Sequence, residues 1–150
     1  MKYLILITLY MAVQSTSAQN LANPTSLFNP APFGFSHVAI VPEGKTLFFI
    51  AGQGGEKDIQ GTLDPSFRDQ VRQVLLNIAK ALESQGLSLN EVVKVTTLVV
   101  DHDQDKLAII VEEFEMAWPE GNFPVNTLIP VPKLALEGMQ IEIDAVAVKQ

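Results

Sequence analysis

Two carboxylates near the C-terminus of the chain have the side chains best placed for chemistry. Residues Met139–Val148 alternate in the manner of a β-strand, which puts Glu142 and Asp144 on one face. That face is polar at the start of the strand and apolar at its end. We therefore expect its first part to be exposed to solvent and its last part to be buried against a second surface. A carboxylate at this crossing could position water or act as a general acid or base. The alternative is a solvent-exposed sheet face, because Asp and Glu are rarely buried.

Two helices are predicted to pack against the apolar face of this strand. Asp64 and Pro65 favour the start of the first helix, and Gly86 is placed to end it. Asp105 can cap the second helix, which should end near Pro119. Apolar residues recur at helical spacing at Phe67, Val71, Val74, Leu75, Ile78 and Leu82 in the first helix and at Leu107, Ile110, Val111, Phe114 and Trp118 in the second.

The remaining strands predict a single α+β domain. Ser36–Val41 and Thr46–Ile50 flank a turn at Pro42–Lys45 and have the pattern of a hairpin. Val92–Val100 is predicted as a buried strand, and Thr127–Val131 contains a proline that places it near a sheet edge. Two helices can cover only one face of a five- or six-stranded sheet. A partner subunit is therefore expected to cover the other face.

The N-terminus has the layout of a secretory signal peptide. A basic residue precedes the apolar run Tyr3–Val13, and the small residues of Thr16–Ala18 suit a cleavage site. We therefore expect residues 1–18 to be a signal peptide, 19–32 an extended leader without regular structure, and 33–150 one domain. The chain has no cysteine, and hence no disulfide and no acceptor for a lipid anchor. The expected location is the periplasm, as a soluble protein that leaves the membrane after cleavage.

The overall charge argues against nucleic acid as a partner. The 150 residues carry a formal net charge of −7, which repels a phosphate backbone. The acidic loop Asp101–Asp105 lacks the glycine and the terminal glutamate of a calcium loop, so no metal site is expected there. No cofactor is predicted either.

An ordered set of segments resembles the Rid family, which is also called the YjgF or L-PSP endoribonuclease family. The resemblance implies a chorismate-mutase-like α+β fold, with a mixed sheet backed by two helices. It also implies a barrel-like homotrimer with small-molecule pockets between subunits. The segments that carry the resemblance are Asn29-Pro30, Gly34–His37, Ala51–Gln53, Val92–Thr96, Phe123-Pro124 and Ile141–Val148.

The resemblance also implies a set of site residues. The glutamate that the family places near the attacking water matches Glu142. The family's carboxylate-binding arginine, however, falls at Asn126, its tyrosine at Phe35 and its serine at Ala51. The family's asparagine on the second helix falls near Val111. Only the glutamate is retained, and the pocket becomes more apolar. The further polar contacts expected at this site are Gln53, Thr127 and His37.

Two functions from different classes are compatible with this sequence. The first is a deaminase that hydrolyses enamines or imines of small metabolites, with Glu142 as the catalytic residue. Because Asn126 cannot grip a carboxylate as arginine does, free 2-imino acids should be poor substrates. The second is a non-catalytic, ligand-binding or chaperone-like trimer that uses the same cleft between subunits.

Overall fold

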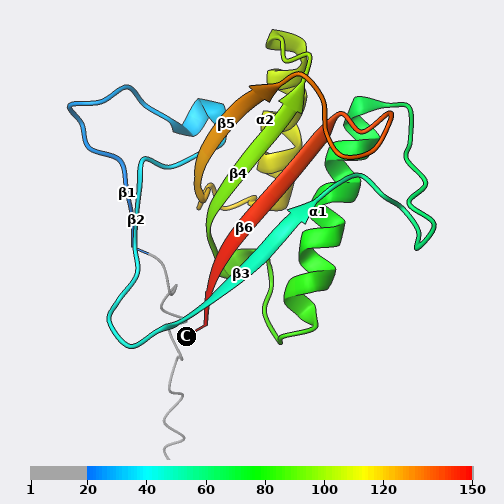
Figure 1. Cartoon of the computed structure of the whole chain (residues 1–150). Helices are drawn as coiled ribbons and strands as arrows, with labels where there is room; N and C mark the ends of the chain where they lie inside the picture. The colour runs from blue at the N-terminus through cyan, green and yellow to red at the C-terminus, as the bar shows by residue number, and fades with distance from the viewer. Residues whose placement is uncertain (1–19, 150) are drawn as a thin grey trace, which may run out of the picture.

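The computed structural model describes residues 20–149, so the expected signal peptide at residues 1–18 lies outside the described part. Residues 20–149 form six strands and two α-helices, with short 3-10 turns at Ala31–Phe33 and Leu89–Glu91 (Figure 1). The elements are β1 (Asn20–Ala22), β2 (Val38–Ile40), β3 (Thr46–Gln53), α1 (Phe67–Glu83), β4 (Val92–Val100), α2 (Gln104–Ala117), β5 (Val125–Val131) and β6 (Ile141–Lys149).

A four-stranded mixed sheet forms the centre of the molecule. Its strand order is β3-β6-β4-β5, with β6 antiparallel to both of its neighbours and β4 parallel to β5. The predicted mixed sheet backed by two helices is thus confirmed, and β5 lies at an edge as its proline indicated. The sheet has four strands rather than five or six, because β1 and β2 form a separate two-stranded ribbon.

The predicted hairpin between Ser36–Val41 and Thr46–Ile50 is wrong. Strand β2 pairs with β1, with Leu21 opposite Ala39, while β3 pairs with β6. The expected leader at 19–32 therefore contains a strand and a 3-10 turn instead of being irregular throughout. The side chain of Asn23 helps to hold this segment, because its Oδ1 accepts a hydrogen bond from the backbone N–H of His37 at 2.9 Å.

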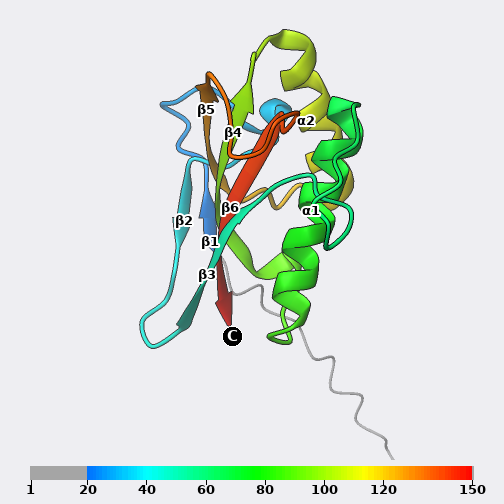
Figure 2. The same ribbon diagram turned by 45° about the vertical axis from the view of Figure 1, so that its right-hand side comes forward.

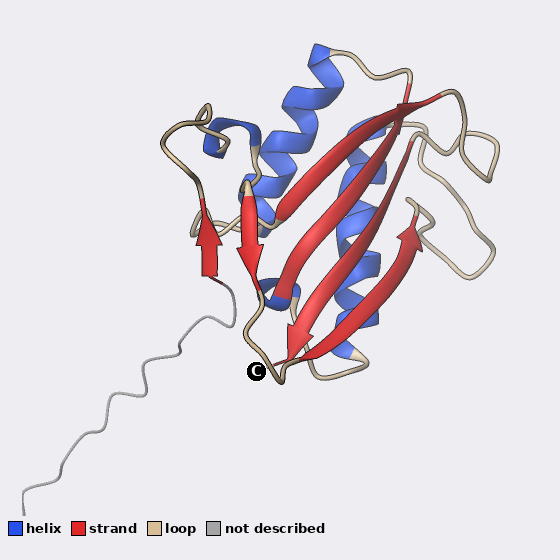
Figure 3. Cartoon of the chain, turned by 60° about the vertical axis from the view of Figure 1, so that its left-hand side comes forward, coloured by secondary structure: helices blue, strands red, loops and turns tan. Residues whose placement is uncertain are grey.

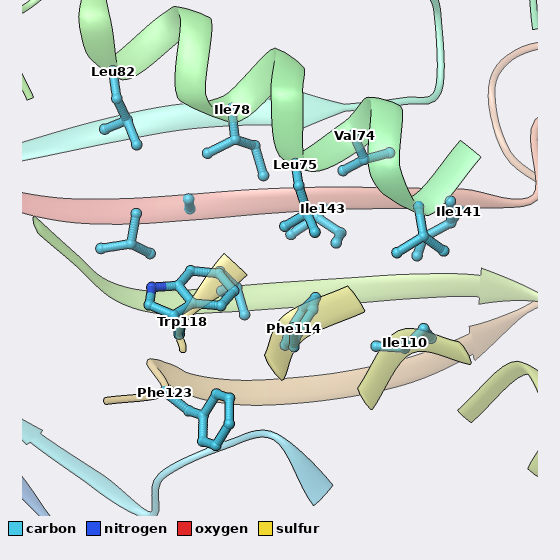
Figure 4. Close-up of a cluster of buried hydrophobic side chains, with 14 of the residues drawn as sticks. Val74, Leu75, Ile78, Leu82, Ile110, Phe114, Trp118, Phe123, Ile141 and Ile143 are labelled. Carbon is cyan, nitrogen blue, oxygen red and sulfur yellow. The ribbon is translucent and has the colours of Figure 1, made fainter. Parts of the chain in front are cut away.

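Both helices pack on the same face of the sheet (Figure 2). The alternation predicted for the last strand is confirmed: Ile141, Ile143, Ala145 and Ala147 are buried beneath the helices. Figure 4 shows side chains of α1, α2 and β6 meeting in this core. The largest fully buried side chains there include Phe114, Ile78, Leu82, Ile141 and Ile143.

The helix starts lie close to the predicted positions, but other residues cap them. The hydroxyl of Ser66 caps α1 by accepting from the Asp69 N–H at 3.3 Å, and Asp64 instead accepts from the N–H of Ser66 at 3.0 Å. Asp103, rather than Asp105, caps α2 by accepting from the N–H of Lys106 at 2.8 Å. At both helix starts, several neighbouring residues have side chains that can cap a helix. The backbone conformation determines which of them accepts the hydrogen bond.

An ion network joins the two helices. Glu113 on α2 is 3% exposed and accepts from Arg68 Nη1 at 2.7 Å and from Arg72 Nε at 2.9 Å. Arg68 also contacts Glu112 at 2.6 Å. Hydrogen bonds to Glu112 and Glu113 raise the pKa of Arg68 above its ordinary value. Arg68 and Arg72 are the two arginines of the chain, and both are engaged on the helix side.

The other sheet face, termed the open face here, has no helix over it in residues 20–149 (Figure 3). The strand register assigns to it Leu47, Phe49, Lys94, Thr96, Leu98, Thr127, Ile129, Glu142, Asp144 and Val146. Several of these are large and apolar, and the side chain of Phe49 is 78% exposed. An apolar face of this kind is a normal sign of an interaction surface. Within the same residues, neither helix is long and apolar enough to cross a bilayer.

Candidate functional site

Glu142 lies on the open face as the second residue of β6, near one end of the sheet and one strand in from its β3 edge. Its register partner is Leu98 of β4, and its side chain is partly buried. On its other side the pairing of β3 with β6 is interrupted between Ile50 and Gln53. This irregularity brings the backbone of Gly52 under the carboxylate: a Cβ at Gly52 would lie 2.8 Å from Glu142 Cδ and 3.0 Å from Cγ. Glycine is therefore required there for the carboxylate to keep its position.

The residues around Gly52 complete one half of a site. The Nε2 of Gln53 donates to the carbonyl oxygens of Ala51 at 3.0 Å and Gly52 at 3.3 Å, which folds the Gln53 side chain back along its own strand. Ala51 itself is exposed. Ala51, Gly52, Gln53 and Glu142 are termed the carboxylate half below. A hollow of about 500 Å³ adjoins it on the side of α1. Its lining consists of Gly52, Gln53, Gly54, Glu56, Lys57, Asp58, Ile59, Asn77 and Lys80.

Phe35 and His37 lie at the opposite edge of the sheet. They flank Ser36, which continues the sheet beyond β5 through a parallel bridge to Val125. His37 Nε2 donates to the carbonyl of Phe28 at 2.9 Å, since a carbonyl oxygen can only accept. The rings of Phe28, Phe35 and His37 contact one another edge to face, with centroids 5.1–5.9 Å apart. These three residues are termed the aromatic half below.

Val111 lies behind the aromatic half. Gly34 has a left-handed backbone with φ of 68°, and a Cβ there would lie 3.8 Å from Val111 Cα. Thr127 lies on the open face, where it is exposed and paired with Thr96. The sequence-predicted residues Phe35, His37 and Val111 are thus together at one edge, and Ala51, Gln53 and Glu142 are together at the other.

Asn126 faces the helix side of the sheet, opposite to Glu142. It pairs in register with Val95, a core residue, and its Oδ1 accepts a hydrogen bond from the hydroxyl of Thr97 at 3.0 Å. Thr97 is fully buried beneath the helices. The structure therefore engages Asn126 within its own chain and does not bring it to the carboxylate of Glu142.

The two halves are far apart in one chain. The segment at Ser36 follows β5, so three strand spacings separate it from β6, about 14 Å in all. The sequence reasoning missed Gly52 and Phe28 as parts of these halves. The glycine-rich run Ala51–Gly55 was a usable signal for a close backbone approach, but nothing local indicated that Glu142 was the group that approaches.

Comparison with known proteins places this fold and these segments in a family. The family described as "Endoribonuclease L-PSP" matches residues 29–149, which is most of the chain. The chain belongs to this family. Solved structures of similar proteins show the same fold. A Rid-family protein of unknown function from Yersinia pestis superposes with a TM-score of 0.81 at 32% identity, covering 87% of this chain and 98% of that one. Escherichia coli TdcF, solved with bound serine, superposes with a TM-score of 0.63 at 26% identity, covering 73% and 85%.

Curated L-PSP family relatives agree with this placement. A RutC family protein from Pyrococcus horikoshii is 34% identical, covering 81% of this chain and 92% of that protein. The 2-iminobutanoate/2-iminopropanoate deaminase of Rattus norvegicus is 30% identical, covering 80% of this chain and 84% of the enzyme. The resemblance to the Rid family that the sequence segments indicated is therefore confirmed, and relatives of this chain include imine deaminases.

Proposed function

We propose that this protein hydrolyses the C=N bond of small imines or enamines, with Glu142 as the catalytic residue. The observation that carries the proposal is the carboxylate of Glu142 lying on Gly52 on the open face. A carboxylate fixed in this way can orient a water molecule and accept its proton as the oxygen attacks the imine carbon. The products are a carbonyl compound and ammonia. The deaminases among the relatives support the same chemistry.

The complete site is proposed to form between two copies of the chain in a homotrimer. One argument is the open face, where apolar side chains such as Phe49 need a cover. The other is the separation of the two halves, because one chain cannot bring its own aromatic half to its own carboxylate half. The aromatic half of one copy and the carboxylate half of the next could instead form one pocket together. The small-molecule ligand would bind at this junction.

Free 2-imino acids are proposed to be poor substrates. Asn126 stands where the family resemblance implies an arginine, and its amide is bonded to Thr97 on the helix side of the sheet. Arg68 and Arg72 are both held by Glu113 on the helices, so neither can bind a substrate carboxylate in this arrangement. Without a guanidinium group, the site cannot bind a substrate carboxylate through two parallel hydrogen bonds.

The test of the proposal measures ammonia release from imines that an oxidase generates in the same vessel. The wild type should accelerate release above the buffer rate, and Glu142→Gln should remove that acceleration. Glu115→Gln is a matched control, because Glu115 is exposed on α2, on the side of the sheet opposite to Glu142 (Figure 2). Equal rates for wild type and Glu142→Gln would refute the role of Glu142. No acceleration of any imine by the wild type would favour the non-catalytic, ligand-binding alternative.

The location is proposed from the sequence alone. We propose that residues 1–18 direct export and are removed, so that the mature protein begins near Gln19 and is soluble in the periplasm. Intact-mass measurement on protein recovered from the periplasm checks this directly. A protein that keeps residues 1–18 and sediments with the membrane would contradict it.

A further inference from the structure

We propose that the ligand of this site is a cation without a carboxylate: a protonated imine, as substrate, whose parent amine also binds. This inference rests on the proposed function and names its substrate class. It follows from the charges and rings that the structure places at the two halves. Imines derived from amino acids differ from this ligand because they carry a negatively charged carboxylate next to the reacting carbon.

The open face is negatively charged around Glu142. Asp144 lies two residues further along β6 on the same face, which is about 7 Å away, and it is exposed. Among the open-face positions of residues 20–149, Lys94 is the only basic residue. Its Nζ donates to the hydroxyl of Thr96 at 2.8 Å. Thr96 is the register partner of Asp144, so the ammonium group of Lys94 lies beside Asp144. The backbone of Lys94 is four residues along β4 from Leu98, the partner of Glu142, which is about 13 Å.

The other charges near the carboxylate half balance one another. The hollow beside Gly52 and Gln53 is lined by two lysines and two carboxylates: Lys57, Lys80, Glu56 and Asp58. Both arginines are engaged with Glu112 and Glu113 on the helices, on the other side of the sheet. On the open face the two carboxylates of Glu142 and Asp144 outnumber the one ammonium group of Lys94, so this part of the face stays net negative and favours a positive ligand.

The aromatic half is suited to the same kind of ligand. Phe28 is 60% exposed, and Phe35 and His37 contact it, so a cluster of rings faces outward without a lysine or arginine among them. Ring faces attract ammonium and iminium groups through their quadrupole. If this cluster closes over the carboxylate half of another copy, the ligand would lie between two carboxylates and an aromatic wall.

The reaction balances for such a substrate. A protonated imine, whose carbon is doubly bonded to a positively charged nitrogen, adds one water molecule: the oxygen of water forms a bond to carbon, and the carbon–nitrogen bond breaks. The nitrogen leaves as an ammonium ion, and the carbon remains as the carbonyl of an aldehyde or ketone. One positive charge is present before and after the step, and nothing is oxidised or reduced. Glu142 holds the water and relays its two protons in turn to nitrogen, first as the oxygen attacks and then as the carbonyl forms, and Asp144 stabilises the charge throughout.

The test compares two imines that share a phenyl ring and differ in the carboxylate. One is made from phenethylamine by an amine oxidase and the other from phenylalanine by an amino-acid oxidase. We expect kcat/KM for the phenethylamine-derived imine to be at least about tenfold higher. Asp144→Asn should reduce this preference severalfold, whereas Glu115→Gln, which removes one negative charge on α2, should leave it unchanged.

A binding measurement keeps this inference separate from catalysis. Phenethylamine and phenylacetate are titrated into the wild-type protein, and binding is followed by NMR or calorimetry. Tighter binding of phenethylamine supports the inference even if neither imine is hydrolysed, a result that would refute only the proposed hydrolase. Equal binding, tighter binding of phenylacetate or a faster reaction of the phenylalanine-derived imine would overturn the inference and leave the hydrolase standing.

Discussion

The carboxyl group of Glu142 lies against the backbone of Gly52, at the point where the pairing of β3 with β6 is interrupted. A side chain on residue 52 and the carboxylate cannot occupy this space together. The position of the proposed catalytic group therefore depends on a residue that contributes no functional group of its own.

Gly52→Ala should strongly reduce kcat/KM and change the thermal midpoint only slightly. The added methyl group would force the carboxylate of Glu142 aside, and a displacement of about 1 Å in a catalytic group can cost about a hundredfold in rate. The measurement is kcat/KM together with the thermal midpoint. Gly55→Ala is the contrasting variant: its methyl group would meet the buried Gln70 at 2.8 Å, so it should lower the midpoint. Unchanged activity in Gly52→Ala would show that the carboxylate position is unimportant.

Phe49→Glu should prevent assembly of the protein. Phe49 is 78% exposed on the open face, and a carboxylate there would be buried without a partner if another copy covers this face. Light scattering should give about three times the chain mass for the wild type and one chain mass for the variant. Leu76→Glu is the control, because Leu76 is 55% exposed on α1 and outside the open face. A monomeric wild type at micromolar concentration would contradict the proposed trimer.

Glu113→Gln should destabilise the packing of α1 against α2. The carboxylate is 3% exposed and accepts hydrogen bonds from two arginines, so the amide would leave at least one guanidinium without its acceptor. We expect a loss of about 1–3 kcal/mol in the free energy of unfolding. Denaturant unfolding of Glu113→Gln and of Glu115→Gln, whose carboxylate is exposed, measures the difference. Equal stability of these two variants would mean that the network contributes little.

The loop that follows the glycine-rich segment should loosen in acid because of Asp58. Hydrogen bonds from the backbone and hydroxyl of Thr62, and from the backbone of Gln60, lower the pKa of Asp58 below its ordinary value of 3.8. A lowered folded-state pKa means that the stabilisation is complete above the unfolded-state value and is lost as pH falls through the folded-state pKa. Amide exchange at Gln60 and Thr62 should therefore lose protection below about pH 4.

Asp58→Asn provides the comparison for the acid effect. It removes the titrating carboxylate, so the protection of the two amides should be weaker at neutral pH and should vary less between about pH 3 and 7. If protection in the wild type did not change across this range, the Asp58 carboxylate would not be what holds the loop.

Features set by local pattern could be predicted from the sequence, whereas features set by distant pairing could not. The alternation of Ile141 and Ile143 identified the core face of β6, and a proline marked β5 as an edge strand. The partner of β2 was missed because β1 competes with β3 for it, and no local signal separates the two pairings.

The candidate site shows the same division. Glu142 and the glycine-rich run could each be found in the sequence, but their contact depends on an irregularity in the pairing of β3 with β6. The face on which Asn126 lies is decided by its register with Val95 on a parallel neighbour. Register shifted by one residue would move it to the other face, and the sequence does not specify that register.

The separation of the aromatic half from the carboxylate half has a genetic consequence. If each pocket takes Phe35 from one copy and Glu142 from another, a defect in either residue damages every pocket of a uniform assembly. Co-expression of two such inactive variants would produce mixed assemblies, and some of their pockets would receive both intact residues. Two null alleles would then complement each other in one cell, and the specific activity of the purified protein would fall on dilution.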